Sequence, residues 1–250
     1  MRTLLCLCTG LFVCVPVLRS AVGGPDLERA REARADPLER LASGNQRYRS
    51  GKADHFNEDR ERRRDLAHAQ HPFALVIGCA DSRVPPELVF DQGLGELFVV
   101  RSAGEVLDDL SIASVEYAVE HLDVRTIIVL GHERCGAVTA ALSGGELPGH
   151  LKYLARAIEP HIEEARAQLP KPADGAAPGS AEIPPEVLDA AVEQNVRGVI
   201  ADLENCGPIL SELAHTGELR FVGARYDLDT GAVEWLGQPK AQEPASRRPR

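Results

Sequence analysis

Residues 73–83 read FALVIGCADSR, and residues 125–135 follow the same plan as RTIIVLGHERC. In each stretch an apolar run ends in glycine and is followed at once by polar side chains. A short run that is apolar on both faces is typical of a buried strand in a parallel sheet. The sequence therefore predicts two buried strands, each with chemically active side chains at its carboxyl end.

Helical and strand-like stretches alternate along the rest of the chain. Residues 25–64 have a charged helical pattern. Further strands are expected at 96–101, 219–226 and 233–236, and helices at 111–121, from 137 onward and at 186–205. This alternation predicts βαβ units, and so an α/β fold with a mainly parallel β-sheet flanked by helices.

The composition is that of an ordinary globular protein. The 250 residues are 44% hydrophobic and 26% charged, with a formal net charge of −10. An acidic chain lacks the basic surface that a general nucleic-acid binder needs, so no nucleic-acid partner is expected. Six cysteines are too few for a disulfide scaffold of this length.

The N-terminus has the layout of a secretory signal peptide over residues 1–23. Arg2 is followed by an uncharged, mostly apolar run over 3–18 and by the small residues of 21–23. The run is shorter than the roughly 20 residues that span a bilayer, although a retained N-terminal anchor is the alternative. We expect cleavage before Gly24, no membrane span afterwards, and a periplasmic or secreted protein.

The mature chain is expected to form one domain over residues 24–236. Residues 169–185 contain five prolines among small residues, which predicts a flexible surface insertion. Residues 237–250 have no packing pattern and are expected to form a disordered tail.

The polar side chains after the two buried strands are candidate metal ligands. Because the carboxyl ends of parallel strands meet at one edge, Cys79 and Asp81 should lie near His132 and Cys135. Two thiolates, an imidazole and a carboxylate suit tetrahedral zinc. Three alternatives stay open: a Cys79–Cys135 disulfide, a closed structural zinc site, and a redox dithiol without the usual Cys-x-x-Cys spacing.

Arg83 separates a catalytic from a structural zinc site. If a bidentate Arg83 contact holds Asp81 off the metal, a fourth position remains for water. Zinc lowers the pKa of such a water to about 7. If the contact breaks, Asp81 becomes the fourth ligand and closes the site.

Three motifs resemble those of β-class carbonic anhydrases: GCADSRVPPE at 78–87, FDQGLGELFVVR at 90–101 and GHERCGAV at 131–138. Residues 41–48 and 114–119 support the resemblance, which extends over about 37–236. It implies one Zn²⁺ per subunit, held by Cys79, His132 and Cys135, with the Asp81–Arg83 dyad at the open position. It implies reversible hydration of carbon dioxide to bicarbonate and a proton, through zinc-bound hydroxide.

The resemblance also implies a homodimer or tetramer whose N-terminal helical arm lies over the neighbour and whose active site lies at the dimer interface. It implies substrate-binding roles for Gln70, Phe98, Tyr117 and Gly136. For the two aromatic residues, a plain core role is the alternative.

Two departures from the family pattern stand out. Val76 replaces a tryptophan of the inhibitory bicarbonate pocket found in some bacterial members, although Arg101 matches that pocket's arginine. We therefore expect no strong shutdown by bicarbonate. Glu105 stands where asparagine is usual, which adds a carboxyl near the site.

Two other functions fit the same residues. One is a zinc hydrolase acting on carbonyl sulfide or carbon disulfide. The other is a zinc- or bicarbonate-binding protein in which Asp81 permanently closes the metal site.

Overall fold

The computed structural model describes residues 34–169 and 182–237. The chain divides into a short unit, Met1–Ala35, and a large one, Asp36–Arg250. The predicted signal segment 1–23 lies outside the described residues, as do 170–181 of the predicted insertion and 238–250 of the predicted tail. The expected N-terminal arm lies partly outside them too.

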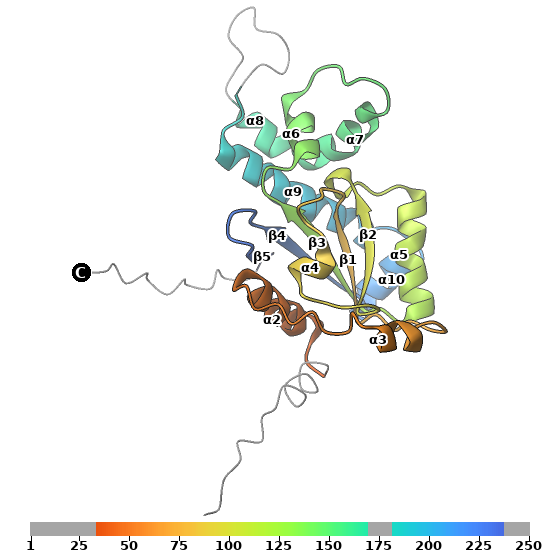
Figure 1. Cartoon of the computed structure of the whole chain (residues 1–250). Coiled ribbons are helices and arrows are strands. Elements are labelled where there is room, and N and C mark those ends of the chain that lie inside the picture. The colour runs from red at the N-terminus through yellow and green to blue at the C-terminus, as the bar shows by residue number, and fades with distance from the viewer. Residues whose placement is uncertain (1–33, 170–181, 238–250) are drawn as a thin grey trace, which may run out of the picture. The chain divides into compact units, whose positions relative to one another are not determined.

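A five-stranded sheet in the order β2-β1-β3-β4-β5 forms the centre of the large unit (Figure 1). The strands are β1 (Ala74–Cys79), β2 (Leu97–Ser102), β3 (Thr126–His132), β4 (Arg220–Tyr226) and β5 (Val233–Leu236). The first four pair in parallel, and β5 pairs antiparallel with β4. The predicted α/β fold with a mainly parallel sheet is therefore confirmed.

Nine α-helices and two 3-10 helices surround the strands in the described part of the chain. They are α2 (Pro37–Arg49), α3 (Arg60–Asp65), α4 (Pro86–Val89), η1 (Ala103–Glu105), α5 (Asp109–Leu122), α6 (Gly136–Ser143), α7 (Leu151–Ile158), η2 (Glu159–His161), α8 (Glu163–Ala167), α9 (Pro185–Glu204) and α10 (Ile209–Thr216). None of these described helices is both long and apolar enough to cross a membrane.

Two hydrophobic clusters lie on opposite faces of the sheet. Val76 and Ile128 point into the cluster that contains residues of α2, α4, α6, α7 and α8. Their neighbours Leu75 and Ile127 point into the other cluster, with residues of α5 and α10. Helix α9 contributes to both clusters. Every residue of β1 and β3 is buried, which explains why these strands read as continuous apolar runs.

One prediction about secondary structure was wrong. The helical pattern over 25–64 is broken, because α2 ends at Arg49 and residues 50–59 form turns and loop before α3. His55 and Asn57 there have positive φ angles of 51° and 57°, which no helix accommodates. Helix α9 begins at Pro185, one residue before the predicted start of that helix and at the last residue of the predicted insertion. Helices α7 and α8 had no counterpart in the sequence prediction.

Candidate metal centre

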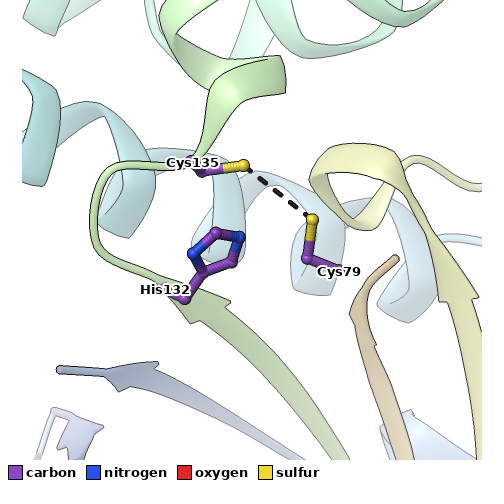
Figure 2. Close-up of side chains that lie close together, drawn as sticks. All are labelled: Cys79, His132 and Cys135. Atoms are coloured by element: carbon purple, nitrogen blue, oxygen red, sulfur yellow. Dashed lines mark hydrogen bonds between the residues drawn. The ribbon is translucent and has the colours of Figure 1, made fainter. Parts of the chain in front are cut away.

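The candidate ligands lie between β1 and β3, where the order of successive strands in the sheet reverses. Strand β1 pairs with β2 on one side and with β3 on the other, while β3 continues to β4. Ligand sites in open α/β sheets lie at such a switch point, outside the carboxyl ends of the strands. Cys79 ends β1, His132 ends β3, and Cys135 directly precedes α6. Figure 2 shows the three side chains converging there.

The geometry of the three side chains suits a metal ion. Their donor atoms all lie within 4.8 Å of one another, and all three residues are buried. The sulfurs of Cys79 and Cys135 are 4.0 Å apart. Zinc–sulfur bonds of about 2.3 Å at a tetrahedral angle place two sulfurs about 3.8 Å apart. Because a disulfide bond measures about 2.05 Å, the disulfide alternative does not hold in this structure, where both thiols are free.

His132 presents one nitrogen to the site. Its Nδ1 lies 2.8 Å from the carbonyl oxygen of Glu133, which fixes the ring. The side chain is fully buried, and its Nε2 has no hydrogen-bond partner in the described structure. An orphaned, buried imidazole nitrogen beside two thiols fits a metal ligand whose other nitrogen is held by a carbonyl.

The thiols are poised unequally. The hydrogen bond with Cys135 lowers the pKa of Cys79, and contacts with His132 and the Gly104 N–H, 3.3 Å from Sγ, lower it further. The same thiol–thiol bond and burial raise the pKa of Cys135. A metal bound by both sulfurs must displace any proton that they carry.

Asp81 is held by Arg83 as the sequence analysis expected. The guanidinium donates from Nε to Oδ1 at 2.9 Å and from Nη2 to Oδ2 at 2.7 Å, and the Arg83 backbone N–H donates to Oδ1. These bonds hold the pKa of Asp81 well below its usual range. Oδ2 lies 3.9 Å from Nε2 of His132, so the restrained carboxylate borders the triad.

Arg101 has a contact that sequence reasoning missed. Its Nε donates to the carbonyl of Cys79 at 2.8 Å, and its Nη2 donates to the carbonyl of Asp81 at 2.6 Å. The side chain thus fixes the backbone on which a ligand and the dyad stand. Its position at the end of a predicted strand was the available signal. The expectation about bicarbonate inhibition stays a prediction.

The predicted substrate-binding residues are not all near the triad within one chain. Gln70 is exposed in the loop before β1. Phe98 is paired in register with Leu75, four residues before Cys79. It contacts Tyr117, which is 48% exposed, with ring centroids 6.4 Å apart. Only Gly136, next to Cys135, lies beside the triad, and a Cβ there would meet nothing within 4 Å. These four roles stay predictions.

Glu105 is buried and follows Gly104, whose N–H contacts Cys79. It is 1% exposed, and its Oε2 accepts from Nδ2 of Asn195 at 3.2 Å. Burial, together with the charge of Cys79, raises the pKa of Glu105 well above its usual value. The expected extra carboxyl is therefore present, and its partner Asn195 was not predicted from the sequence.

Comparison with known proteins agrees with the resemblance found in the sequence. A family model described as "Carbonic anhydrase" matches residues 74–233. The chain is 38% identical over 195 residues to "Carbonic anhydrase 2" of Mycobacterium tuberculosis, covering 76% of this chain and 87% of the relative. It is 39% identical over 199 residues to "Carbonic anhydrase" of Mycolicibacterium smegmatis, covering 78% and 89%.

Solved structures of β-carbonic anhydrases have a similar fold. One of two tetrameric enzymes from Sordaria macrospora matches with a TM-score of 0.60 at 26% identity, covering 86% of this chain and 99% of that chain. The Coccomyxa enzyme in complex with acetazolamide matches with a TM-score of 0.59 at 28% identity, covering 87% of each chain.

Proposed function

Because this chain belongs to the β class of carbonic anhydrases, we propose that it hydrates carbon dioxide reversibly to bicarbonate and a proton at one zinc ion. Cys79, His132 and Cys135 would hold this ion. The observation that carries the proposal is the unpartnered Nε2 of buried His132, enclosed with two free thiols within 4.8 Å. Hard cations such as Mg²⁺ prefer oxygen ligands, so this donor set favours zinc.

Zinc bound by two thiolates and one imidazole would supply the acidity that activates a water near neutral pH. The residues around it determine how that water is used. The Asp81 carboxylate is ionised throughout the neutral range, because Arg83 keeps its pKa low. It is therefore a hydrogen-bond acceptor that orients a water at the triad for attack on carbon dioxide.

Arg83 keeps Asp81 in this role. Its fork occupies one lone pair on each carboxylate oxygen, which opposes rotation of Asp81 toward the metal. Loss of the fork would free Oδ2, only 3.9 Å from Nε2 of His132, to act as a fourth ligand. We propose that this exchange is the gate between the active and the closed site.

We further propose that the protein works as a homodimer or tetramer. The similar structure from Sordaria macrospora is described as tetrameric. Tyr117 is exposed on α5, and Gln70 is exposed in its loop. Both side chains are available to a second subunit, and a substrate-binding role for them requires one.

The export of the protein is proposed from its sequence. A signal peptide over residues 1–23 would place a mature domain of residues 24–236 in the periplasm or outside the cell. The mass of the exported protein tests this, since a species that begins at Met1 would contradict cleavage.

One sample can test the central proposal. Zinc content and the initial rate of carbon dioxide hydration are measured between pH 7 and 9 on the purified mature protein, with Cys79→Ser as the control. We expect about one zinc per chain and a hydration rate that rises with pH. A zinc-loaded protein without hydration activity would contradict the proposal and favour a closed binding site. Faster turnover of carbonyl sulfide or carbon disulfide would contradict the proposed substrate.

A further inference from the structure

Four side chains form a hydrogen-bonded series that runs from Glu105, next to Gly104, to the surface. Nδ2 of Asn195 lies 3.2 Å from Oε2 of Glu105, and Oδ1 of Asn195 lies 3.2 Å from Nδ1 of His161. Nε2 of His161 lies 3.0 Å from Oδ2 of Asp202. The four residues come from η1, α9 and η2, which are distant in sequence.

The inner two members of this series are buried. Glu105 and Asn195 are each 1% exposed, whereas the side chain of Asp202 is 70% exposed. Burying a polar group costs free energy unless it is hydrogen-bonded, so these side chains depend on one another for their positions.

Helix α9 is shaped to admit the imidazole. A Cβ at Gly198 would lie 2.2 Å from Cγ of His161, so only glycine leaves room for the ring. Glycine inside a helix costs roughly 0.5–1 kcal/mol relative to alanine. The helix carries this cost at the position where His161 packs.

Asn195 links this network to a candidate zinc ligand. Its Nδ2 also donates to the carbonyl oxygen of Gly104 at 2.9 Å. The N–H of the same Gly104 points to Sγ of Cys79 at 3.3 Å. Gly104 has a φ of 70°, and a Cβ there would lie 2.7 Å from Cδ1 of Ile158. The glycine therefore has one tightly packed position, which Asn195 holds.

Glu105 directly follows the glycine whose N–H contacts Cys79. Its Oε1 is buried and has no hydrogen-bond partner in the described structure. Its other oxygen, Oε2, accepts from Nδ2 of Asn195 at 3.2 Å, so Asn195 holds the carboxyl from one side.

We propose that Glu105, Asn195 and His161 are positioning residues that hold the Gly104 N–H against Cys79 and thereby set how firmly the two thiolates retain zinc. This inference rests on the proposed zinc site. Partners behind metal ligands typically change metal affinity 10–100-fold when they are removed.

Three variants and one control test the network. Glu105→Ala and Asn195→Leu remove hydrogen bonds to the Gly104–Glu105 segment, and we expect zinc release to become about 10–100-fold faster. Glu105→Gln keeps a side chain of the same size with an oxygen that accepts from Asn195, so its zinc release should stay within about twofold of wild type. Leu203→Ala is the control, because Leu203 is equally buried on α9 and outside the network.

The measurements do not depend on catalysis. Zinc release is followed by transfer to a chromophoric chelator, and the thiolate-to-metal charge-transfer absorption is recorded after replacing zinc with Co²⁺. We expect this absorption to shift in Glu105→Ala and Asn195→Leu, and to stay unchanged in Glu105→Gln and Leu203→Ala.

The possible failures are distinguishable. Wild-type protein that retains no zinc would overturn the proposed function and this inference with it. Zinc-loaded Glu105→Ala and Asn195→Leu proteins with wild-type release rates would overturn this inference alone. Equal acceleration in Leu203→Ala would also overturn it, because loosening of α9 would then explain the effect.

Discussion

Arg83 restrains the Asp81 carboxylate through two side-chain hydrogen bonds, and substitution removes that restraint in two steps. Arg83→Lys keeps the positive charge and can replace one of the two bonds, but it loses the planar fork. Arg83→Ala loses both side-chain bonds. Both variants keep the backbone N–H bond to Oδ1 at 2.9 Å, so the turn itself should persist.

The size of the effect follows from the exposure of the pair. A hydrogen bond to a charged group contributes about 1.5–3 kcal/mol. The Arg83 side chain is 50% exposed, so solvent screening reduces each bond to about 1 kcal/mol. At 1.36 kcal/mol per factor of ten, we expect kcat/KM to fall about fivefold in Arg83→Lys and about thirtyfold in Arg83→Ala. Zinc content should not change, because Arg83 is not a ligand.

The assay is stopped-flow hydration of carbon dioxide with a pH indicator, with zinc measured on the same samples. Asp229→Asn is the matched control, since it weakens a similar fork, between Arg134 and Asp229, outside the triad. Wild-type kcat/KM in zinc-loaded Arg83→Ala would refute the restraint. An equal loss in Asp229→Asn would show that the effect is a general one of surface charge.

Four further changes have defined outcomes. Asp81→Asn should lower kcat/KM by about 10²–10⁴-fold with zinc retained, and full activity would remove Asp81 from the mechanism. Cys79→Ser should lose zinc and melt at the temperature of chelator-treated wild type, below that of the zinc-loaded protein, because a bound metal stabilises the native state. Gly136→Ala should leave the melting temperature unchanged, since a Cβ at this position meets open space. It should lower kcat/KM about tenfold, because the added methyl group narrows the approach to the triad. An unchanged kcat/KM would argue against a substrate role for this glycine. Burial alone would raise the pKa of Asp91, but bonds from Arg47 and from backbone N–H groups lower it overall. Asp91→Asn should therefore cost most stability above about pH 4, and the difference in melting temperature from wild type should shrink as the pH falls below that value. A difference independent of pH would contradict the ionised role.

The metal triad could be predicted from the sequence because its information is local. Two apolar runs predict buried parallel strands, and the residues after them must then lie at one edge of the sheet. Cys79, Asp81 and Arg83 follow one run, and His132 and Cys135 follow the other. That the two strands are direct neighbours in the sheet came from the structure.

The hydrogen bonds that hold the backbone around the triad could not be predicted, because they join residues far apart in the sequence. Asn195 is 91 positions from Gly104, and nothing near either residue indicates their bond. The backbone contacts of Arg101 likewise depend on β1 and β2 lying side by side. Glu105 stood out only as a departure from a family pattern, and its burial required the fold.

Local patterns also failed where tertiary contacts override them. The backbone N–H groups of Asp54 and His55 donate to Asp91, which draws residues 50–59 out of the helical pattern. Helices α7 and α8 are short and are separated by a 3-10 turn containing Pro160. Each has too few turns to give a reliable periodicity.

The origin of the ligands in two strands has a consequence for how the protein matures. Cys79 and Cys135 are 56 positions apart, and only the pairing of β1 with β3 brings their sulfurs together. A partly folded chain therefore offers isolated thiols of low metal affinity, and full affinity arises only with the assembled centre of the sheet. The rate of zinc binding in a refolding experiment therefore reports when the central strands pair.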